Sequence, residues 1–283
     1  AKHVKALLES YHDDIEVALV GITTEGDRRL DARLSDVGGK GLFIKELEFA
    51  LSDGRADIAI HSMKDVPASL PKGFCVITVG ERADPRDAFV STSAKSFDGL
   101  VHGARVGSSS TRRGAQLKHL RPDIEVVAVR GNVGTRLRKL DAGECHALML
   151  AAAGLERLGL QARITQRMDV DSCVPAAGQG ALAAEYEAAR SDIAALLEPL
   201  TVQHVQRAVV AERSLVNALS GDCTMPLGAY ATVDGTRVKL QAVLAQEDGK
   251  RLLRVSGEGD DSQRLGRDVA DKLFAMGARE LLS

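Results

Sequence analysis

The sequence predicts an α/β protein with mainly parallel sheets in two lobes, followed by a smaller α+β domain. Up to about residue 200, short apolar runs alternate with segments of helical periodicity, which is typical of strand–helix–strand units. Beyond that point, one long amphipathic segment precedes two hairpin signals, Asp234-Gly235 and Asp248-Gly249. Two joints of charged or small residues, at 81–87 and 174–180, indicate that the chain leaves the first lobe and later re-enters it.

The first part contains short apolar runs that we expect to form strands. They cover residues 15–22, 56–60, 74–79, 104–107, 124–129 and 146–150. Helical spacing follows some of them, and Leu47, Ala50 and Leu51 share one face of a helix over residues 45–51. Further helices are expected over 112–120 and 133–140. Because strands that are joined through helices pair in parallel, we expect mainly parallel sheets covered by helices.

The last part follows a different pattern. Residues 202–219 predict one helix, because apolar residues recur there at helical spacing together with Glu212 and Arg213. Alternating residues around the two hairpin signals predict antiparallel strands, and residues 262–276 predict a final helix. We therefore expect three domains, formed by residues 1–80 with 180–199, by residues 86–176, and by residues 203–283.

Composition excludes several classes of protein. Hydrophobic residues make up 45% of the 283 residues, which is enough for packed cores. The net charge is −2 and aromatic residues make up only 3%, which argues against a nucleic-acid-binding protein. No stretch reaches the roughly 20 apolar residues that a membrane helix needs, and the first residues lack a signal-peptide pattern. We expect a cytoplasmic protein.

The cysteines are too widely spaced for a disulfide framework or a metal cluster, so we expect no bound metal. Cys75 and Cys145 lie in or beside apolar runs and are expected to be core thiols, whereas Cys173 adjoins a joint and stays ambiguous. Cys223 lies in a loop bounded by Gly and Pro, where a thiolate could be reached. The residues alone nevertheless favour an unreactive loop cysteine.

Positive charge is concentrated in the middle of the chain. Residues 105–139 contain nine Lys and Arg residues against two acidic residues. The segment 107–113 ends a strand and opens a helix with Arg112 and Arg113 in its first turn, and Asn132 begins a second such helix. Helix starts of this kind bind anions, and an Arg in the first turn opposes the helix dipole unless an anion compensates it. We therefore favour a site for a small polyanion over a solvated basic face. The sequence contains no phosphate-loop motif, so a nucleotide is not favoured as the ligand.

Two loops are candidates for chemistry. His61 to Pro67 directly follow the strand expected over 56–60, at the strand end where ligands bind in open α/β sheets. Asp65 could hold a proton or stabilise a cation beside Lys64, and a plain turn-forming acid is the alternative. The glycine-rich loop before the helix over 45–51 could be a mobile lid that carries Lys40, or an ordinary connector.

Several strings along the chain, taken together, resemble the porphobilinogen deaminase family of the tetrapyrrole pathway. They occur in family order between residues 37 and 230 and read VGGKGLF, ADIAIHSMKDVP, DPRDAFV, GSSSTRR, VRGNVGTRLRKL, AAGLERLGL, PAAGQGAL, AERS and GDCTMPLGAY. No single string decides the resemblance, whereas the ordered set is highly specific.

The resemblance implies a fold and an activity. The first two domains should resemble the lobes of a type II periplasmic binding protein. A dipyrromethane cofactor should be tethered through a thioether to Cys223, which reverses the expectation for this thiol drawn from the residues alone. The enzyme would be a transferase of heme biosynthesis that adds four porphobilinogen units head-to-tail, each with loss of ammonia, and releases hydroxymethylbilane.

The resemblance also implies roles for individual residues. Asp65 matches the catalytic acid, which assists the departure of ammonia and stabilises the azafulvene cation, with Ser62 and Lys64 as flanking substrate contacts. The pyrroles carry acetate and propionate groups, so the growing chain is a small polyanion. The remaining matches are Lys40 and Phe43 on the active-site loop, Gln179 at the joint between lobes, and the carboxylate-binding set Ser108, Ser109, Ser110, Arg112, Arg113, Arg130 and Arg136.

Some features depart from the family pattern. The family's first strand carries an Arg-x-Ser-x-Leu-Ala motif, which has no match in this sequence. Glu25 and Asp36 stand where basic residues are common, and Asp222 stands where glycine often precedes the cysteine. A two-lobed anion-binding module without catalysis is the alternative from another class of protein. We expect a monomer that acts on porphobilinogen, with neither nucleic acid nor membrane as partner.

Overall fold

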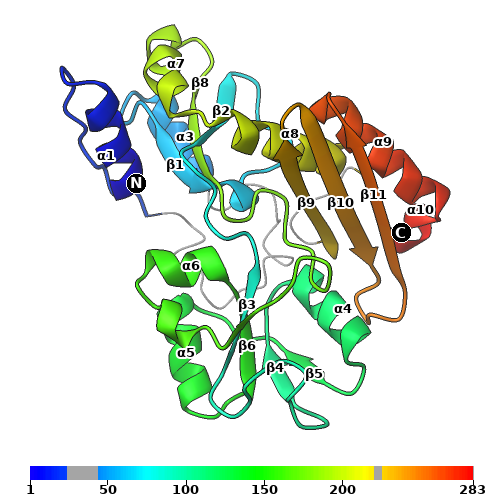
Figure 1. Ribbon diagram of the computed structural model, residues 1–283. Coiled ribbons are helices and arrows are strands. Elements are labelled where there is room, and N and C mark those ends of the chain that lie inside the picture. Colours follow the sequence, from blue (N-terminus) through cyan, green and yellow to red (C-terminus); the bar gives the residue numbers. More distant parts are fainter. Residues whose placement is uncertain (24–43, 220–224, 283) are drawn as a thin grey trace.

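The computed structural model describes residues 1–23, 44–219 and 225–282, and in that part of the chain it contains three sheets with helices packed against them (Figure 1). The α/β class and the separate C-terminal domain of sheet and helix are confirmed. Lys40, Phe43 and Cys223 lie outside the described residues.

The first sheet joins segments from distant parts of the chain. Its strands are, in spatial order, β1 (Ala59–Ser62), β8 (Leu182–Glu187) and β2 (Phe74–Val79). Both pairings are antiparallel, so β1 and β2 run in the same direction with β8 between them in the opposite one. Apolar side chains from this sheet form one core with those of α1 (Lys2–Tyr11) and α7 (Ser191–Leu197).

The second sheet has a parallel half and an antiparallel half. Its strands are, in spatial order, β5 (Glu125–Val127), β4 (Arg105–Gly107), β6 (Ala147–Ala151), β3 (Asp87–Ser91) and β7 (Gln166–Arg167). β4 pairs in parallel with β5 and β6, whereas β3 runs antiparallel to β6 and β7. Separate apolar cores include Leu117 of α4 (Thr111–Leu120) and Leu137 of α5 (Val133–Asp141), and α6 (Ala152–Arg157) directly follows β6.

The C-terminal domain is an antiparallel meander of β9 (Leu227–Asp234), β10 (Arg237–Ala245) and β11 (Leu252–Gly259). Both expected hairpins form, with Gly235 and Gly249 in the left-handed region that such turns require. α8 (Gln203–Ala218) and α9 (Ser262–Ala275) pack against this sheet, and α10 (Ala278–Leu282) ends the described chain.

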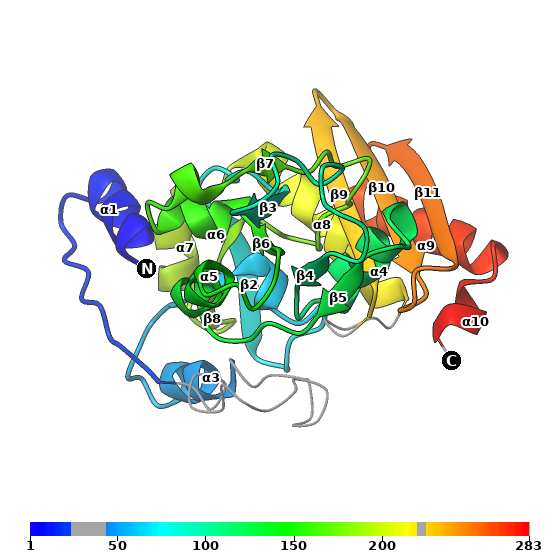
Figure 2. The ribbon, with the colours of Figure 1, turned by 90° about the horizontal axis from the view of Figure 1, so that it is seen from below.

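The remaining elements are short. α3 (Lys45–Ser52) lies against β1 and β8, and 3-10 turns cover Met63–Asp65, Gln161–Arg163 and Glu198–Leu200. α4 lies between the second sheet and the C-terminal domain (Figure 2), where the imidazole of His119 hydrogen-bonds the carbonyl oxygen of Gly249 at 3.0 Å. No helix in the described ranges has the length and apolar character needed to cross a bilayer.

Most expected elements form close to their expected bounds, but the expected strand over 15–22 is wrong. The run follows α1 and forms no ladder with any described strand. Side chains of α1 bind its backbone instead, since the N–H of Val17 donates to Glu9 and its carbonyl accepts from Lys5. Leu19 and Val20 are 49% and 59% exposed. An apolar run predicts a strand only where the fold supplies a partner.

The expectation of mainly parallel sheets also needs correction. Among the described strands, only β4–β5 and β4–β6 pair in parallel. In the first sheet the reason is that the chain re-enters the first lobe. β8 returns from the other lobe and inserts between β1 and β2, antiparallel to both. This pairing supports, as our proposal, the division into residues 1–80 with 180–199, residues 86–176 and residues 203–283.

The two joints between the lobes lie in backbone contact. The N–H of Ala83 donates to the carbonyl oxygen of Gly180 at 3.2 Å. Gly180 has a φ of +90°, and a Cβ there would lie 2.4 Å from the carbonyl oxygen of Ala83. Only glycine therefore allows the two segments to approach this closely.

We expect Gly180→Ala to destabilise the protein by clearly more than Gly73→Ala. Gly73 has a comparable φ of +98° with open space around the missing Cβ, so alanine there adds only the backbone strain of about 1–3 kcal/mol. Alanine at 180 adds a collision with backbone, of about 1–3 kcal/mol more. Urea unfolding of both variants measures the difference, and equal losses would contradict a close packing of the joints.

Candidate functional site

The two expected helix starts in the second lobe form as predicted. β4 ends at Gly107 and α4 begins at Thr111, with the side chain of Ser110 accepting from the N–H of Arg113. α5 begins after Asn132, whose side chain accepts from the N–H of Thr135 at 2.8 Å. These caps satisfy N–H groups that would otherwise lack partners at a helix start.

Arg112 and Arg113 bind an internal carboxylate. Both are buried, and they donate to Asp87, which is fully buried on β3. The closest contacts are 2.7 Å, from Arg112 Nη1 to Oδ2, and 2.8 Å, from Arg113 Nε to Oδ1. The sequence argument that these arginines need an anion is thus met by a residue of the chain itself. They do not project freely toward an external ligand.

The charge balance around Asp87 follows from these contacts. Burial alone would raise the pKa of the Asp87 carboxyl, but the charges and hydrogen bonds of Arg112 and Arg113 hold it well below its usual range. Cys173 donates to the same carboxylate at 3.4 Å, and burial together with the negative charge of Asp87 raises the pKa of this thiol to about 12. Cys173 is therefore an unreactive thiol of this cluster.

Gln179 connects the cluster to the joint between the lobes. Its amide nitrogen donates to the carbonyl oxygen of Pro85 at 2.6 Å and to Asp87 Oδ1 at 2.9 Å, and its amide oxygen accepts from Arg113 at 3.3 Å. Gln179 as a whole is 1% exposed. The joint and the helix start are therefore fixed by one set of hydrogen bonds.

The candidate catalytic turn directly follows β1. Ser62 ends the strand, and Met63–Asp65 form a 3-10 turn on which Asp65 is exposed and Lys64 half-buried. Burial lowers the pKa of Lys64, and the positive charges of Arg113 and Arg112 add to this effect, while Asp65 and Asp87 oppose it. The fold thus brings the turn within electrostatic reach of the arginine cluster.

Arg136 is a half-buried cation of the second lobe and a candidate for binding an anionic ligand. Its Nε donates to the carbonyl oxygen of Gly131 at 2.8 Å, and no carboxylate of the described residues pairs with it. Burial and then the positive charge of Arg113 lower the pKa of Arg136. An anionic ligand that entered here would relieve both unfavourable effects. Arg130 is half-buried just before the same helix start.

The three serines differ in their surroundings. Ser108 is buried, and its hydroxyl accepts from the N–H of Ser110 at 3.2 Å. Ser109 is exposed and donates to the carbonyl oxygen of Val129 at 2.9 Å. Together with the cap made by Ser110, these hydroxyls chiefly shape the loop that presents the start of α4.

Besides Asp87, two buried acidic residues near the site could not be assigned from the sequence. Glu212 of α8 is fully buried and pairs with Arg82 at 2.7 Å, and it also accepts from the N–H of Gly178 at 2.6 Å. Glu185 of β8 is also buried, and its Oε2 lies 2.8 Å from Nε2 of His61 on β1. A glutamate among apolar residues at helical spacing was the only available signal for Glu212.

Comparison with known proteins finds the same family that the sequence motifs resemble. Residues 1–195 match the family model "Porphobilinogen deaminase, dipyromethane cofactor binding domain", and residues 206–275 match "Porphobilinogen deaminase, C-terminal domain". The porphobilinogen deaminase of Thiobacillus denitrificans is 49% identical over 284 residues, covering 100% of this chain and 93% of that protein. That of Chromobacterium violaceum is 49% identical, covering 100% and 92%. This chain belongs to the porphobilinogen deaminase family.

Some solved structures are similar to part of this chain at low sequence identity and low TM-score. The periplasmic VFT2 domain of Bordetella pertussis BvgS is 18% identical, with a TM-score of 0.41, over 69% of this chain and 74% of that chain. A probable amino-acid ABC transporter extracellular-binding protein of Bacillus subtilis is 14% identical, with a TM-score of 0.43, over 70% and 78%.

The described residues fit the cofactor for which the porphobilinogen deaminase model is named. A dipyrromethane carries carboxylate side chains, and the second lobe offers two capped helix starts and the guanidinium groups of Arg130 and Arg136. The desolvated ammonium group of Lys64 adds a further cation from the first lobe. This donor set matches the negative charge of the group.

We expect Asp87→Asn to destabilise the protein by about 3–5 kcal/mol, because the change leaves two buried guanidinium groups without their negative partner. The matched control is Glu258→Gln, which removes an exposed pair with Arg237 and should cost no more than about 1 kcal/mol. The free energy of unfolding in urea measures both. Similar losses in the two variants would contradict the central role of Asp87.

The wild type and Asp87→Asn together test how the stability depends on pH. Because the folded-state pKa of Asp87 is depressed, the carboxylate contributes stability that is present above its unfolded pKa of about 4 and is lost as the pH falls toward the folded value. Between about pH 4 and pH 2, the free energy of unfolding should therefore fall more steeply in the wild type than in Asp87→Asn. Parallel curves would refute this assignment.

Proposed function

We propose that this chain joins four porphobilinogen molecules head-to-tail on a dipyrromethane group bound through a thioether to Cys223, and then releases hydroxymethylbilane for heme biosynthesis. The observation that carries the proposal is that one joint links the Lys64-Asp65 turn to the start of α4: a Cβ on Gly178 would lie 3.2 Å from the backbone nitrogen of Lys64, and the next residue, Gln179, accepts a hydrogen bond from Arg113 at 3.3 Å. Membership of the porphobilinogen deaminase family supplies the substrate and the cofactor.

The binding of anionic substrate is assigned to residues of both lobes. Arg130, Arg136 and the start of α5 would bind acetate and propionate groups, and Lys64 would bind a further carboxylate from the first lobe. Arg112 and Arg113 support these contacts by fixing the start of α4, with Ser108, Ser109 and Ser110 shaping its loop. When bound, dipyrromethane supplies the pyrrole carbon to which the first unit is joined. Lys40 and Phe43 are proposed to contact substrate from the loop before α3.

Asp65 is assigned the catalytic role. In each cycle the bond between the substrate's methylene carbon and its amino nitrogen breaks, and the nitrogen leaves as ammonia. A carboxylate placed beside the remaining cation stabilises it, an effect worth several kcal/mol where water is excluded. The methylene carbon then bonds to the free pyrrole carbon at the end of the chain already bound, and that carbon loses a proton. Asp65 is exposed on its turn and so is able to face a substrate, with Ser62 beside it.

The setting of the activity is proposed from family membership. We propose a cytoplasmic monomer whose partner is the small molecule porphobilinogen, acting without nucleic acid or membrane. A non-catalytic anion-binding module would use the same arginines but would need neither Asp65 nor a modified thiol. The two experiments below therefore distinguish these functions.

We expect Asp65→Asn to retain the cofactor and to lose turnover by at least about a hundredfold, because the amide cannot offset the positive charge that develops on the substrate. The matched control is Asp53→Asn, at the exposed end of α3, which should keep wild-type turnover. The measurement is hydroxymethylbilane formation per cofactor-loaded protein. Near-normal turnover in Asp65→Asn would remove its catalytic role.

We expect the intact mass of the active protein to exceed the mass of the chain by two linked pyrrole units. Cys223→Ser should lose this increment together with activity, whereas Cys75→Ser, in β2, should retain both. An active preparation in which Cys223 is unmodified and reacts freely with an alkylating reagent would overturn the proposed attachment.

A further inference from the structure

We propose that Arg213 is a positioning residue for catalysis, because it binds the backbone that follows Asp65 from the helix that leads to Cys223. This inference rests on the proposed function and assigns a role to a residue outside the proposed cofactor- and substrate-binding set.

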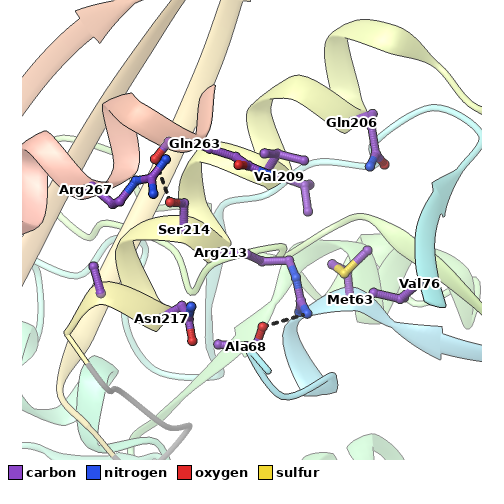
Figure 3. A pocket seen from close by; sticks show the side chains of 12 residues that line it. Met63, Ala68, Val76, Gln206, Val209, Arg213, Ser214, Asn217, Gln263 and Arg267 are labelled. Atoms are coloured by element: carbon purple, nitrogen blue, oxygen red, sulfur yellow. Dashed lines mark hydrogen bonds between the residues drawn. The ribbon is translucent and has the colours of Figure 1, made fainter. Parts of the chain in front are cut away.

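The contacts of Arg213 are directed at one short stretch of backbone. Its guanidinium donates to the carbonyl oxygens of Val66 at 3.0 Å, Pro67 at 2.7 Å and Ala68 at 3.3 Å. Figure 3 shows the side chain reaching from α8 to the segment that carries Ala68. Three successive carbonyl groups of the first lobe thus bind one side chain of the C-terminal domain.

The local backbone has few other means of holding this stretch. The N–H of Val66 donates to Met63 and closes the 3-10 turn, and Pro67 has no N–H to donate. Three consecutive carbonyl groups therefore find their partner in the guanidinium, and hydrogen bonds from a charged donor are stronger than those between neutral groups. Burial lowers the pKa of Arg213, but arginine stays charged in this setting.

Apolar packing holds the chain at Val66 and at Leu70, and Pro67 and Ala68 between them are only half-buried. Met63 and Val66 share a core with Val205 and Val209 of α8. Next to that core, a cavity of about 370 Å³ separates part of the stretch from α8 and α9, and Ala68 and Arg213 line it (Figure 3). The hydrogen bonds of Arg213 therefore hold the backbone at the point where it borders this cavity.

The neighbouring residue on α8 binds the joint that lies against the same turn. Glu212 accepts from the N–H of Gly178, and a Cβ on Gly178 would lie 2.6 Å from the side chain of Met63. Arg213 therefore binds the backbone after Asp65, and Glu212 binds the joint that lies against Met63, before Asp65. α8 ends at Ala218, five residues before Cys223. The helix that binds the backbone after Asp65 is thus the element that precedes Cys223 in the sequence.

The consequence concerns rate more than binding. Without the guanidinium, the 66–68 backbone is free to shift, and Asp65 moves with it. A displacement of about 1 Å at a reacting group can reduce a rate by about a hundredfold, whereas the carboxylate-binding residues of the second lobe are untouched. Loss of Arg213 should therefore lower kcat and leave KM nearly unchanged.

The test compares Arg213→Met with Arg207→Met in the full-length, cofactor-loaded enzyme. Arg207 lies on the same helix and also donates to backbone carbonyl oxygens, those of Gly235, Thr236 and Asp260, but within the C-terminal domain. It is therefore a control for the loss of an arginine that bridges backbone groups. The readouts are kcat, KM, cofactor content by intact mass, and the thermal unfolding midpoint.

We expect Arg213→Met to lower kcat ten- to a hundredfold at full cofactor content, with KM within threefold of wild type. Arg207→Met should keep kcat within twofold. Arg213→Lys should recover part of kcat, because an ammonium group also donates to carbonyl oxygens, and it serves as the variant to assay if Arg213→Met does not fold.

Two results would overturn the inference. One is a kcat for Arg213→Met and Arg213→Lys equal to that of Arg207→Met. The other is a loss of activity in the Arg213 variants that merely follows their loss of cofactor or of folded protein. Asp65→Asn, assayed alongside, separates this failure from that of the proposed function: if Asp65→Asn is inactive while Arg213→Met is fully active, only the role of Arg213 is refuted.

Discussion

The buried carboxylate of Asp87 is the partner on which the basic region of this protein depends. Two guanidinium groups in the first turn of α4 oppose the helix dipole and lose their hydration when buried. Asp87 offsets both effects by accepting hydrogen bonds from Arg112 and Arg113. Gln179 extends the cluster to the joint between the lobes. The position of α4 is therefore set within the chain, which leaves Arg136 as a desolvated cation without a described carboxylate partner.

α8 has a comparable role for the other half of the site. Its consecutive residues Glu212 and Arg213 contact the joint and the backbone after Asp65, so a helix of the C-terminal domain determines geometry in the first lobe. A helix transmits position well because its backbone hydrogen bonds leave little freedom along its length. The first lobe carries Asp65, the joint lies against the turn before it, and α8 binds the backbone that follows it.

The parts of the site that sequence predicted are those governed by neighbours in the chain. The starts of α4 and α5 could be predicted because a cap binds N–H groups only three residues away. The partner of Arg112 could not, since Asp87 lies 25 residues earlier and reaches the arginine only through the sheet. The same reasoning led to the wrong strand over 15–22, because an apolar run does not reveal whether a neighbouring strand exists. The assignment of Cys223 and Asp65 came from motif resemblance and stays a proposal.

By itself, the sequence determined the helices and strands between residues 104 and 150 of the second lobe, the main elements of the C-terminal domain, where its hairpins turn, and to which family the chain belongs. It did not indicate β3, α6 or β7. Periodicity, caps and glycine turns are local, and ordered motifs need no coordinates. Only the tertiary structure decided which charges meet: that Asp87 binds the paired arginines, that Glu212 binds the joint, and that Arg213 binds the turn after Asp65. The physical reason is that ion pairing and burial depend on distance in space, which the order of residues along a chain does not fix.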